Sequence, residues 1–193
     1  HVGPGHQWGD TFIHLPAEGV LFAGDVMFRS CTPMAWAGSF ADWQKSLDRV
    51  LALNPAVIVP GHGPSCGIEA VHELKAYLQH VFEEARQWFD RGLPELAAAR
   101  QIDLGPYAEW NAPARLYFNV ARAYREFRGE PHDAPWAIPK VFAEIYKLAK
   151  ARAKVGTGDP WGAFTVLRRY LEDHPLTAHV SAIEKLTYEI GKT

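Results

Sequence analysis

The sequence predicts an α/β fold that is followed by an α-helical region. Short β-prone stretches bounded by glycine or proline lie within the first 66 residues. Beyond them, apolar residues recur every three or four positions, as in amphipathic helices. Hydrophobic residues make up 48% of the 193-residue chain and charged residues 22%, with a net charge of −2. This composition is ordinary for a globular protein and gives no sign of nucleic-acid binding.

The first 66 residues follow a strand, helix, strand order. Thr11–Leu15 and Val20–Ala23 are expected to pair as a hairpin, and Gly24-Asp25 to end its second strand. Ser39-Phe-Ala-Asp42 resembles a capping box and predicts a helix after it. Three β-branched or aliphatic residues, Val57–Val59, predict a short buried strand. Alternation of strands and helices of this kind favours an α/β architecture.

Two later segments predict amphipathic helices that pack on each other. In the first, apolar side chains are spaced 3, 4, 3, 4, 3 and form a narrow seam. The seam consists of Val71, Leu74, Leu78, Val81, Ala85 and Trp88. A short Ala-rich helix is expected to end near Gln101. In the second segment, Asn111-Ala-Pro113 looks like a cap for a helix with an apolar face from Leu116 to Phe127.

Composition suggests four segments along the chain. We expect a sheet-containing segment at 1–66, a helical extension at 67–128, a proline-rich linker at 129–139 and a C-terminal helical region at 140–193. The last segment has 9 basic and 6 acidic side chains, whereas the rest of the chain has an acidic excess. Its helices are expected near 140–153, 160–173 and 178–190.

Three metal-capable side chains stand beside glycine near the ends of the predicted strands. They occur in Gly5-His-Gln-Trp-Gly-Asp10, in Phe22-Ala-Gly-Asp25 and in Pro60-Gly-His-Gly63. Neutral imidazole and carboxylate are ligands for zinc, iron and manganese. His6, Asp25 and His62 are therefore the candidate metal ligands.

These three motifs, in this order, resemble those of the metallo-β-lactamase-fold superfamily, in its broad hydrolase branch. The resemblance covers residues 1 to about 65 and implies the C-terminal half of an αββα sandwich. The family's first signature, His-x-His-x-Asp-His, is absent, and we expect it upstream in a longer protein. One face of the short sheet should then lack a covering layer. Gln7 stands where the family usually has threonine.

The resemblance implies roles for the three residues and two divalent metals, zinc first, with iron or manganese as alternatives. His6 would complete the first metal site, His62 would bind the second metal, and the carboxylate of Asp25 would bridge the two. A metal-bound hydroxide would then attack an ester, lactone, thioester or related bond. The expected partner is a small-molecule substrate, without nucleic acid or membrane, and the helices could form a homodimer. A cytoplasmic location is favoured.

Two other functions remain open. One is an iron-dependent oxidoreductase of the same superfamily, similar to a persulfide dioxygenase. The other is a helical interaction or dimerisation protein whose metal site is vestigial. Metal content, oxygen uptake and ester turnover distinguish these alternatives from the hydrolase.

Other polar and aromatic residues have simpler interpretations. Asp10 is expected to stabilise a turn, His14 to lie at the surface or in the core, and Cys66 to be a free buried thiol. Aromatic residues of the extension could line a substrate site, but their helical spacing favours the core. These are Trp110, Tyr117, Phe118 and Tyr124. The histidines without ligand spacing are His72, His80, His132, His174 and His179.

Overall fold

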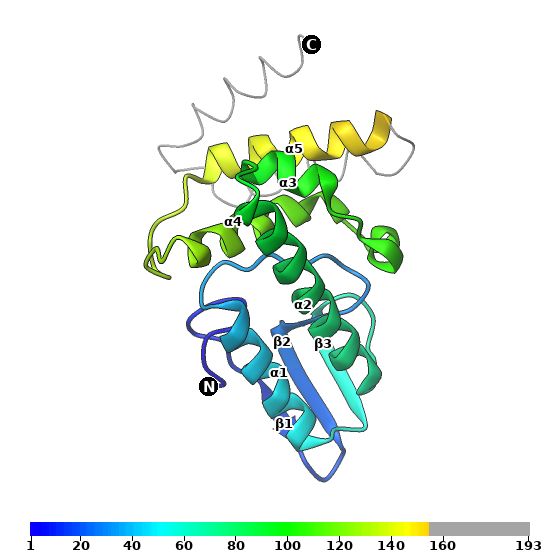
Figure 1. Cartoon of the computed structure of the whole chain (residues 1–193). Coiled ribbons are helices and arrows are strands. Elements are labelled where there is room, and N and C mark those ends of the chain that lie inside the picture. The colour runs from blue at the N-terminus through cyan, green and yellow to red at the C-terminus, as the bar shows by residue number, and fades with distance from the viewer. Residues whose placement is uncertain (155–193) are drawn as a thin grey trace, which may run out of the picture.

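The computed structural model describes residues 1–154 of the chain as a sheet layer joined to a layered group of helices (Figure 1). The predicted α/β architecture is confirmed. One cluster of buried hydrophobic side chains runs through both parts. The helices expected near 160–173 and 178–190 lie outside the described residues, whereas the helix expected at 140–153 is present as α5, Ile138–Lys154. No helix within the described range is both long and apolar enough to cross a bilayer.

The sheet has three strands in the order β1-β2-β3. β1, Ile13–Leu15, pairs antiparallel with β2, Val20–Phe28, which confirms the hairpin, and β2 pairs parallel with β3, Val57–His62. The expectation that β2 ends at Gly24-Asp25 is wrong, because the strand continues to Phe28. Gly24 has φ +53°, and the register with β3 shifts on both sides of it. This irregularity accommodates the glycine, so that the strand continues past it.

Two helices cover one face of the sheet (Figure 1). The predicted capping box at Ser39 and Asp42 starts α1, Phe40–Leu53, with both reciprocal hydrogen bonds present. The second covering helix is α2, Glu69–Asp90. Together they place the apolar sides of both helices against the buried side of the strands.

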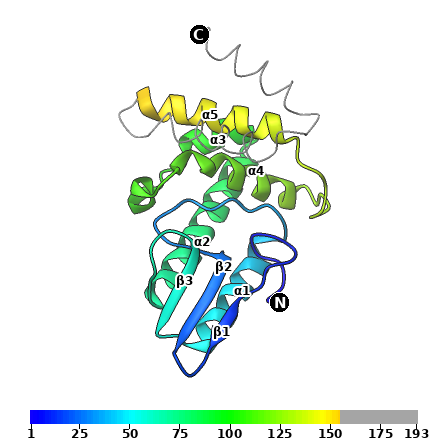
Figure 2. The same ribbon diagram turned by 180° about the vertical axis from the view of Figure 1, so that it is seen from behind.

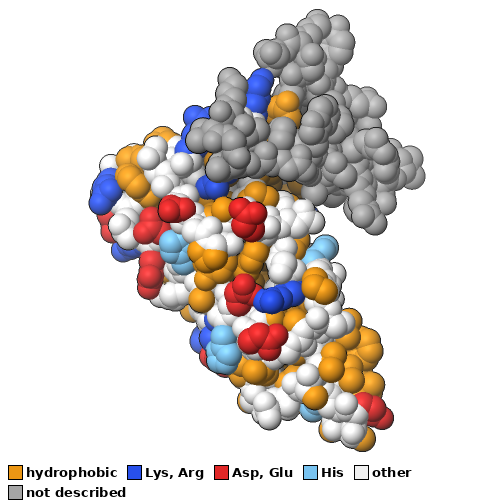
Figure 3. Space-filling view, turned by 90° about the vertical axis from the view of Figure 1, so that its right-hand side faces the viewer, with side chains coloured by type: hydrophobic (Ala, Val, Ile, Leu, Met, Phe, Trp, Pro, Cys, Tyr) orange, Lys and Arg blue, Asp and Glu red, His pale blue; other side chains and the backbone are white. Residues whose placement is uncertain are grey.

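The other face of the sheet is turned towards the viewer in Figure 2. It carries exposed apolar side chains. Ile13 is 62% exposed, Phe22 44% and Val57 40%. A space-filling view likewise shows hydrophobic side chains gathered at the sheet end of the molecule (Figure 3). The prediction of a buried strand at Val57–Val59 is therefore only partly correct. Ile58 is fully buried, but its neighbours point to the opposite face because side chains alternate along a strand.

The helical part consists of α2, α3 (Glu95–Gln101), α4 (Leu116–Phe127) and α5, with short 3₁₀ helices at Gly105–Glu109 and Pro113–Arg115. The expected packing of α2 on α4 is confirmed, and pairs of aromatic rings lie between the two helices. The ring pairs Phe82–Phe127 and Phe89–Tyr124 have centroid distances of 5.0 and 5.1 Å.

The expected side-chain cap at Asn111 is wrong. Ala112, which precedes Pro113, has a left-handed backbone with φ 56°, and no side chain caps the turn that follows. The main chain of Asn111 instead joins the segment after β2: its N–H donates to Ser30 O and its C=O accepts from Thr32 N, each at 2.9 Å. Backbone pairing thus takes the place of the predicted cap.

Segment 128–137, between α4 and α5, is held against the rest of the molecule. The Trp136 indole N–H donates to Trp36 O at 3.0 Å, and Arg125 Nη2 donates to Ala134 O at 2.9 Å. Arg122, which is buried in α4, donates from Nε to Gly38 O at 2.9 Å. These bonds connect the helices to the loop that precedes α1.

Candidate metal centre

The structure brings the three predicted ligands together. Asp25 lies between the two histidines: its Oδ2 is 3.7 Å from His6 Nδ1, and its Oδ1 is 3.5 Å from His62 Nε2. His6 comes from the loop before β1, Asp25 from the middle of β2 and His62 from the last position of β3. One carboxylate therefore faces two imidazoles, one with each oxygen.

The glycines on either side of His62 allow this close approach. A Cβ on Gly61 would collide with the Asp25 carboxylate and with the backbone of Gly24 and Asp25. Gly63 has φ +93°, and a Cβ there would collide with the backbone carbonyl of Arg29. Only glycine fits both positions without a shift of the neighbouring strand. The Pro-Gly-His-Gly pattern is thus explained by the contact between β2 and β3.

His6 is buried and is held in a tight loop. Its exposed fraction is 6%, and its C=O accepts a hydrogen bond from Ala37 N at 3.0 Å. Asp10 stabilises the loop, since its Oδ2 accepts from Gln7 N at 3.0 Å, which confirms the turn interpretation. Burial raises the pKa of the Asp10 carboxyl.

The electrostatic surroundings keep the imidazole of His6 neutral. Burial lowers its pKa to about 4, against the opposing attraction of Asp25, and His62 and Arg115 lower it further. A neutral ring has a free lone pair at neutral pH, which is the form that binds a metal ion.

Two aromatic residues that the sequence analysis did not single out shape the site. Phe28 stacks on His62 with a centroid distance of 4.8 Å and contacts His6 at 5.6 Å. The indole of Trp43 meets His6 edge-on at 6.0 Å and is fixed by a hydrogen bond from its N–H to Val26 O at 3.0 Å. Phe28 was missed because the strand was expected to end three residues earlier. Trp43 lies in the helix predicted after Ser39, but the sequence does not show that it contacts His6.

The three side chains are of types that bind divalent metals, but three are too few to complete two metal sites. Within residues 1–152, no group of three or more His, Cys, Asp and Glu side chains is arranged so that it could hold a metal ion. Two donors on one tetrahedral metal at about 2.1 Å lie roughly 3.4 Å apart. Both nitrogen–oxygen separations around Asp25 are close to that value. Each metal would thus receive two donors from these residues and would require further ligands.

The other residues considered in the sequence analysis lie away from the three candidate ligands or form other contacts. Cys66 is a free, half-buried thiol that donates to Ile58 O at 3.8 Å. His80 contacts Asp103 O in the helical part, at 2.7 Å. The four aromatic residues of the extension are buried, which confirms that they belong to the core: Trp110, Tyr117, Phe118 and Tyr124. His174 and His179 lie outside the described residues.

Several known proteins are similar to parts of this chain. The sequence model of the metallo-beta-lactamase superfamily matches residues 1–62. A metallo-beta-lactamase type 2 from Bacteroides fragilis is 32% identical over 88 residues, which are 43% of this chain and 35% of that protein. A linear primary-alkylsulfatase from a Pseudomonas species is 25% identical over 154 residues, which are 69% of this chain and 29% of that protein.

Two further proteins are similar to parts of this chain. A beta-lactamase-like protein 2 homolog from Caenorhabditis elegans is 30% identical over 84 residues, 44% of this chain and 28% of that protein. The crystal structure of a metallo-beta-lactamase family protein from Thermus thermophilus aligns with a TM-score of 0.48 and 27% identity. That alignment covers 65% of this chain and 42% of the other.

The curated relatives that match parts of this chain are named as a metallo-beta-lactamase, an alkylsulfatase and a beta-lactamase-like protein. Residues 1–62 are thus similar to the metallo-beta-lactamase superfamily. The chain spans about a third of the length of the curated relatives that it matches.

Proposed function

We propose that this chain contributes His6, Asp25 and His62 to a two-metal hydrolase that cleaves an ester, lactone, thioester or related bond. The observation that supports this proposal is the position of one carboxylate between two imidazoles, with a separate oxygen directed to each. A carboxylate in this position can bridge two ions that lie about 3.5–4 Å apart. Two relatives are named as hydrolases, a β-lactamase and an alkylsulfatase.

Each residue has a distinct task in this proposal. Bound divalent metals would supply Lewis acidity and activate water. His6 would offer a neutral, buried nitrogen that is already oriented by its loop. His62 is held by its strand and by the stacked ring of Phe28, so little side-chain motion needs to be lost on binding. Asp25 would keep the two sites at a fixed separation.

Metal content measured by elemental analysis tests the assignment, together with hydrolysis of a panel of activated esters and lactones. In the longer protein expected above, which would supply the further ligands, Asp25→Ala should reduce both metals and lower kcat/KM at least about 100-fold, because both sites lose a ligand. His62→Ala should leave about one metal per chain. Full metal content and full activity in Asp25→Ala would contradict the proposal.

Two substitutions serve as controls. Trp8→Phe lies within the same motif but is exposed and has no ligand atom, and His72→Ala removes an exposed imidazole from α2. Both should retain metal and turnover. Iron content with oxygen uptake in place of ester hydrolysis would support the oxidoreductase, and a protein without bound metal would support the vestigial site.

A further inference from the structure

Arg115 reaches from the helical part towards the sheet. It ends the 3₁₀ helix Pro113–Arg115, immediately before α4. Its Nη1 donates to Thr32 O at 3.2 Å and contacts Cys31 Sγ at 3.5 Å. These contacts fix one nitrogen of the guanidinium against the segment that follows β2.

That segment connects Arg115 to the candidate metal centre. Arg29 N donates to His62 O at 2.9 Å, directly after the paired residues Phe28 and His62. Three residues further on, Thr32 receives the hydrogen bond from Arg115. The guanidinium is thus held against the segment that leads directly from the strand ends carrying Phe28 and His62.

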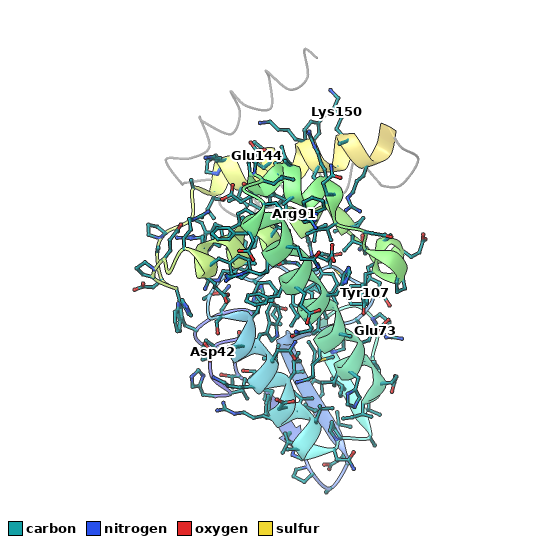
Figure 4. The ribbon with its side chains drawn as sticks, viewed as in Figure 1. Asp42, Glu73, Arg91, Tyr107, Glu144 and Lys150 are labelled. Carbon is teal, nitrogen blue, oxygen red and sulfur yellow. The ribbon has the colours of Figure 1, made fainter. Side chains whose placement is uncertain are left out.

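Much of the hydrogen-bonding capacity of Arg115 is unused. Within the described residues it forms no ion pair, and neither Nε nor Nη2 has a hydrogen-bond acceptor. Nε is buried, whereas Nη2 is not among the buried unpartnered atoms and so remains in contact with solvent. Beside it, the buried hydroxyl of Thr32 also lacks a partner. The neighbouring Arg29, by contrast, is paired with Glu73, which is labelled in Figure 4.

We propose that Arg115 binds an anionic group of the substrate, a carboxylate, sulfate or phosphate, and thereby orients the substrate over His6, Asp25 and His62. The proposal rests on the function proposed above for those three residues. A guanidinium anchored through one nitrogen and open at another presents donors in a fixed plane, which suits an oxyanion better than a neutral group. The helical part would thus determine which substrates the sheet residues act on.

The first arm of the test measures anion binding without turnover. Sulfate, phosphate and acetate are titrated separately into the full chain by isothermal titration calorimetry. Wild type should bind at least one of them, and the tightest identifies the class of anionic group. Arg115→Gln should bind it at least about 10-fold more weakly, which corresponds to the loss of a charge-assisted hydrogen bond. Absence of binding to wild type, or equal binding to both proteins, would overturn the proposal.

The second arm measures the role of Arg115 in substrate choice. A neutral activated ester is compared with the same ester carrying a remote anionic group. Arg115→Gln should lower kcat/KM for the anionic ester about 10- to 100-fold, mainly through KM, and change the neutral ester by less than about 2-fold. An equal loss for both esters would mean that Arg115 only supports the fold, and would overturn the proposal.

Control variants distinguish a loss of anion recognition from a loss of folding. Arg91→Gln removes an exposed guanidinium at the end of α2, among the helices (Figure 4), and should behave as wild type. Arg115→Lys keeps the charge but not the planar fork, so its preference for the anionic ester should fall about 5-fold even if Arg115→Gln does not fold. An unchanged preference in Arg115→Lys, with Arg115→Gln unfolded, would count against the proposal.

Metal content distinguishes this proposal from the proposed function. If the chain holds no metal and cleaves neither ester but still binds anions through Arg115, only the hydrolase assignment fails. If metal and turnover are intact but the ester preference does not depend on Arg115, only the present inference fails.

Discussion

In the sheet region, residues 1–66, helices cover one face of three strands and leave apolar side chains exposed on the other. In the helical region, residues 67–152, the helices pack on one another from several sides, and most of their seam residues are buried. The candidate metal ligands all belong to the sheet region. Stability and chemistry are therefore distributed unequally: the helices supply most of the enclosed core, and the strands position the reactive groups.

The two regions are joined by buried polar contacts as well as by packing. Asn119 in α4 accepts from Ala35 N at 3.0 Å through Oδ1 and donates from Nδ2 to Pro33 O at 3.0 Å and to the Tyr77 hydroxyl at 2.9 Å. Because each of these hydrogen bonds requires its partner in one position, together they fix how the loop before α1 packs on α4. The two regions are thus firmly joined to each other. They differ in how completely their apolar surfaces are covered.

The largest expected effect is in the helical seam. Leu78 is fully buried in α2, and Leu78→Asp would place an unpaired charge there and remove a packed side chain. The cost should exceed about 5 kcal/mol, comparable with the whole stability of a domain, so that the variant fails to fold. Circular dichroism during thermal melting measures this. Ala76→Asp, on the exposed side of the same helix, should melt close to wild type, and equal behaviour of the two variants would contradict the burial of the seam.

An intermediate effect is expected at the junction of the two regions. Glu126 in α4 accepts a hydrogen bond from Phe40 N at 3.0 Å, and its Oε1 lies 3.8 Å from Arg122 Nε. Burial raises its pKa to about 7, although Phe40 and Arg122 oppose the shift, and Asp42 adds to it. Because the pKa in the folded state lies above that in the unfolded chain, stability from this group is full below about pH 4.5. It is lost as pH rises through about 7.

The loss should be on the order of 2–3 kcal/mol between pH 5 and 8, measured by urea unfolding at a series of pH values. Glu126→Gln cannot ionise but keeps an oxygen that can accept from Phe40, so it should remove most of this dependence. An identical pH profile in Glu126→Gln would show that another group is responsible.

The smallest effect is expected on the open face of the sheet. Phe22 pairs with Ile13 there and is largely exposed, so Phe22→Thr should change the free energy of unfolding by less than about 0.5 kcal/mol. Leu21→Thr, one position earlier on the buried face, should cost roughly 3 kcal/mol. Urea midpoints compare the two. Similar costs would mean that the two faces are equally covered, and the contrast between the regions would disappear.

Much of the fold could be predicted from local patterns. The seam of α2, the capping box at Ser39 and the hairpin each depend on residues close in sequence, and the structure confirms all three. The extension of β2 past Gly24 could not be predicted, because glycine and aspartate usually weaken a strand. There, pairing with β3 outweighs local propensity, and a shift in register accommodates the glycine.

The candidate site likewise contains residues that local motifs predict and residues that they do not. The residues His6, Asp25 and His62 could be selected by their motifs, and the structure places them side by side; their metal-binding roles stay a prediction. Phe28 could not be selected, because its contact with both imidazoles depends on the unpredicted end of β2. Arg115 could not be selected either, because its position beside Cys31 and Thr32 depends on the pairing of Asn111 with Ser30 and Thr32, about 80 residues earlier in the chain.

The continuity of α2 has a consequence for how the molecule unfolds. This helix of 22 residues is about 33 Å long, and it packs on α1 and β2 as well as on α3 and α4. Loss of either set of contacts removes the support for one helix that both regions share. The described residues should therefore melt in one cooperative transition rather than as separate units. Ligand binding at the strand ends would then protect the helices as well, because folded helices and a folded site are populated together.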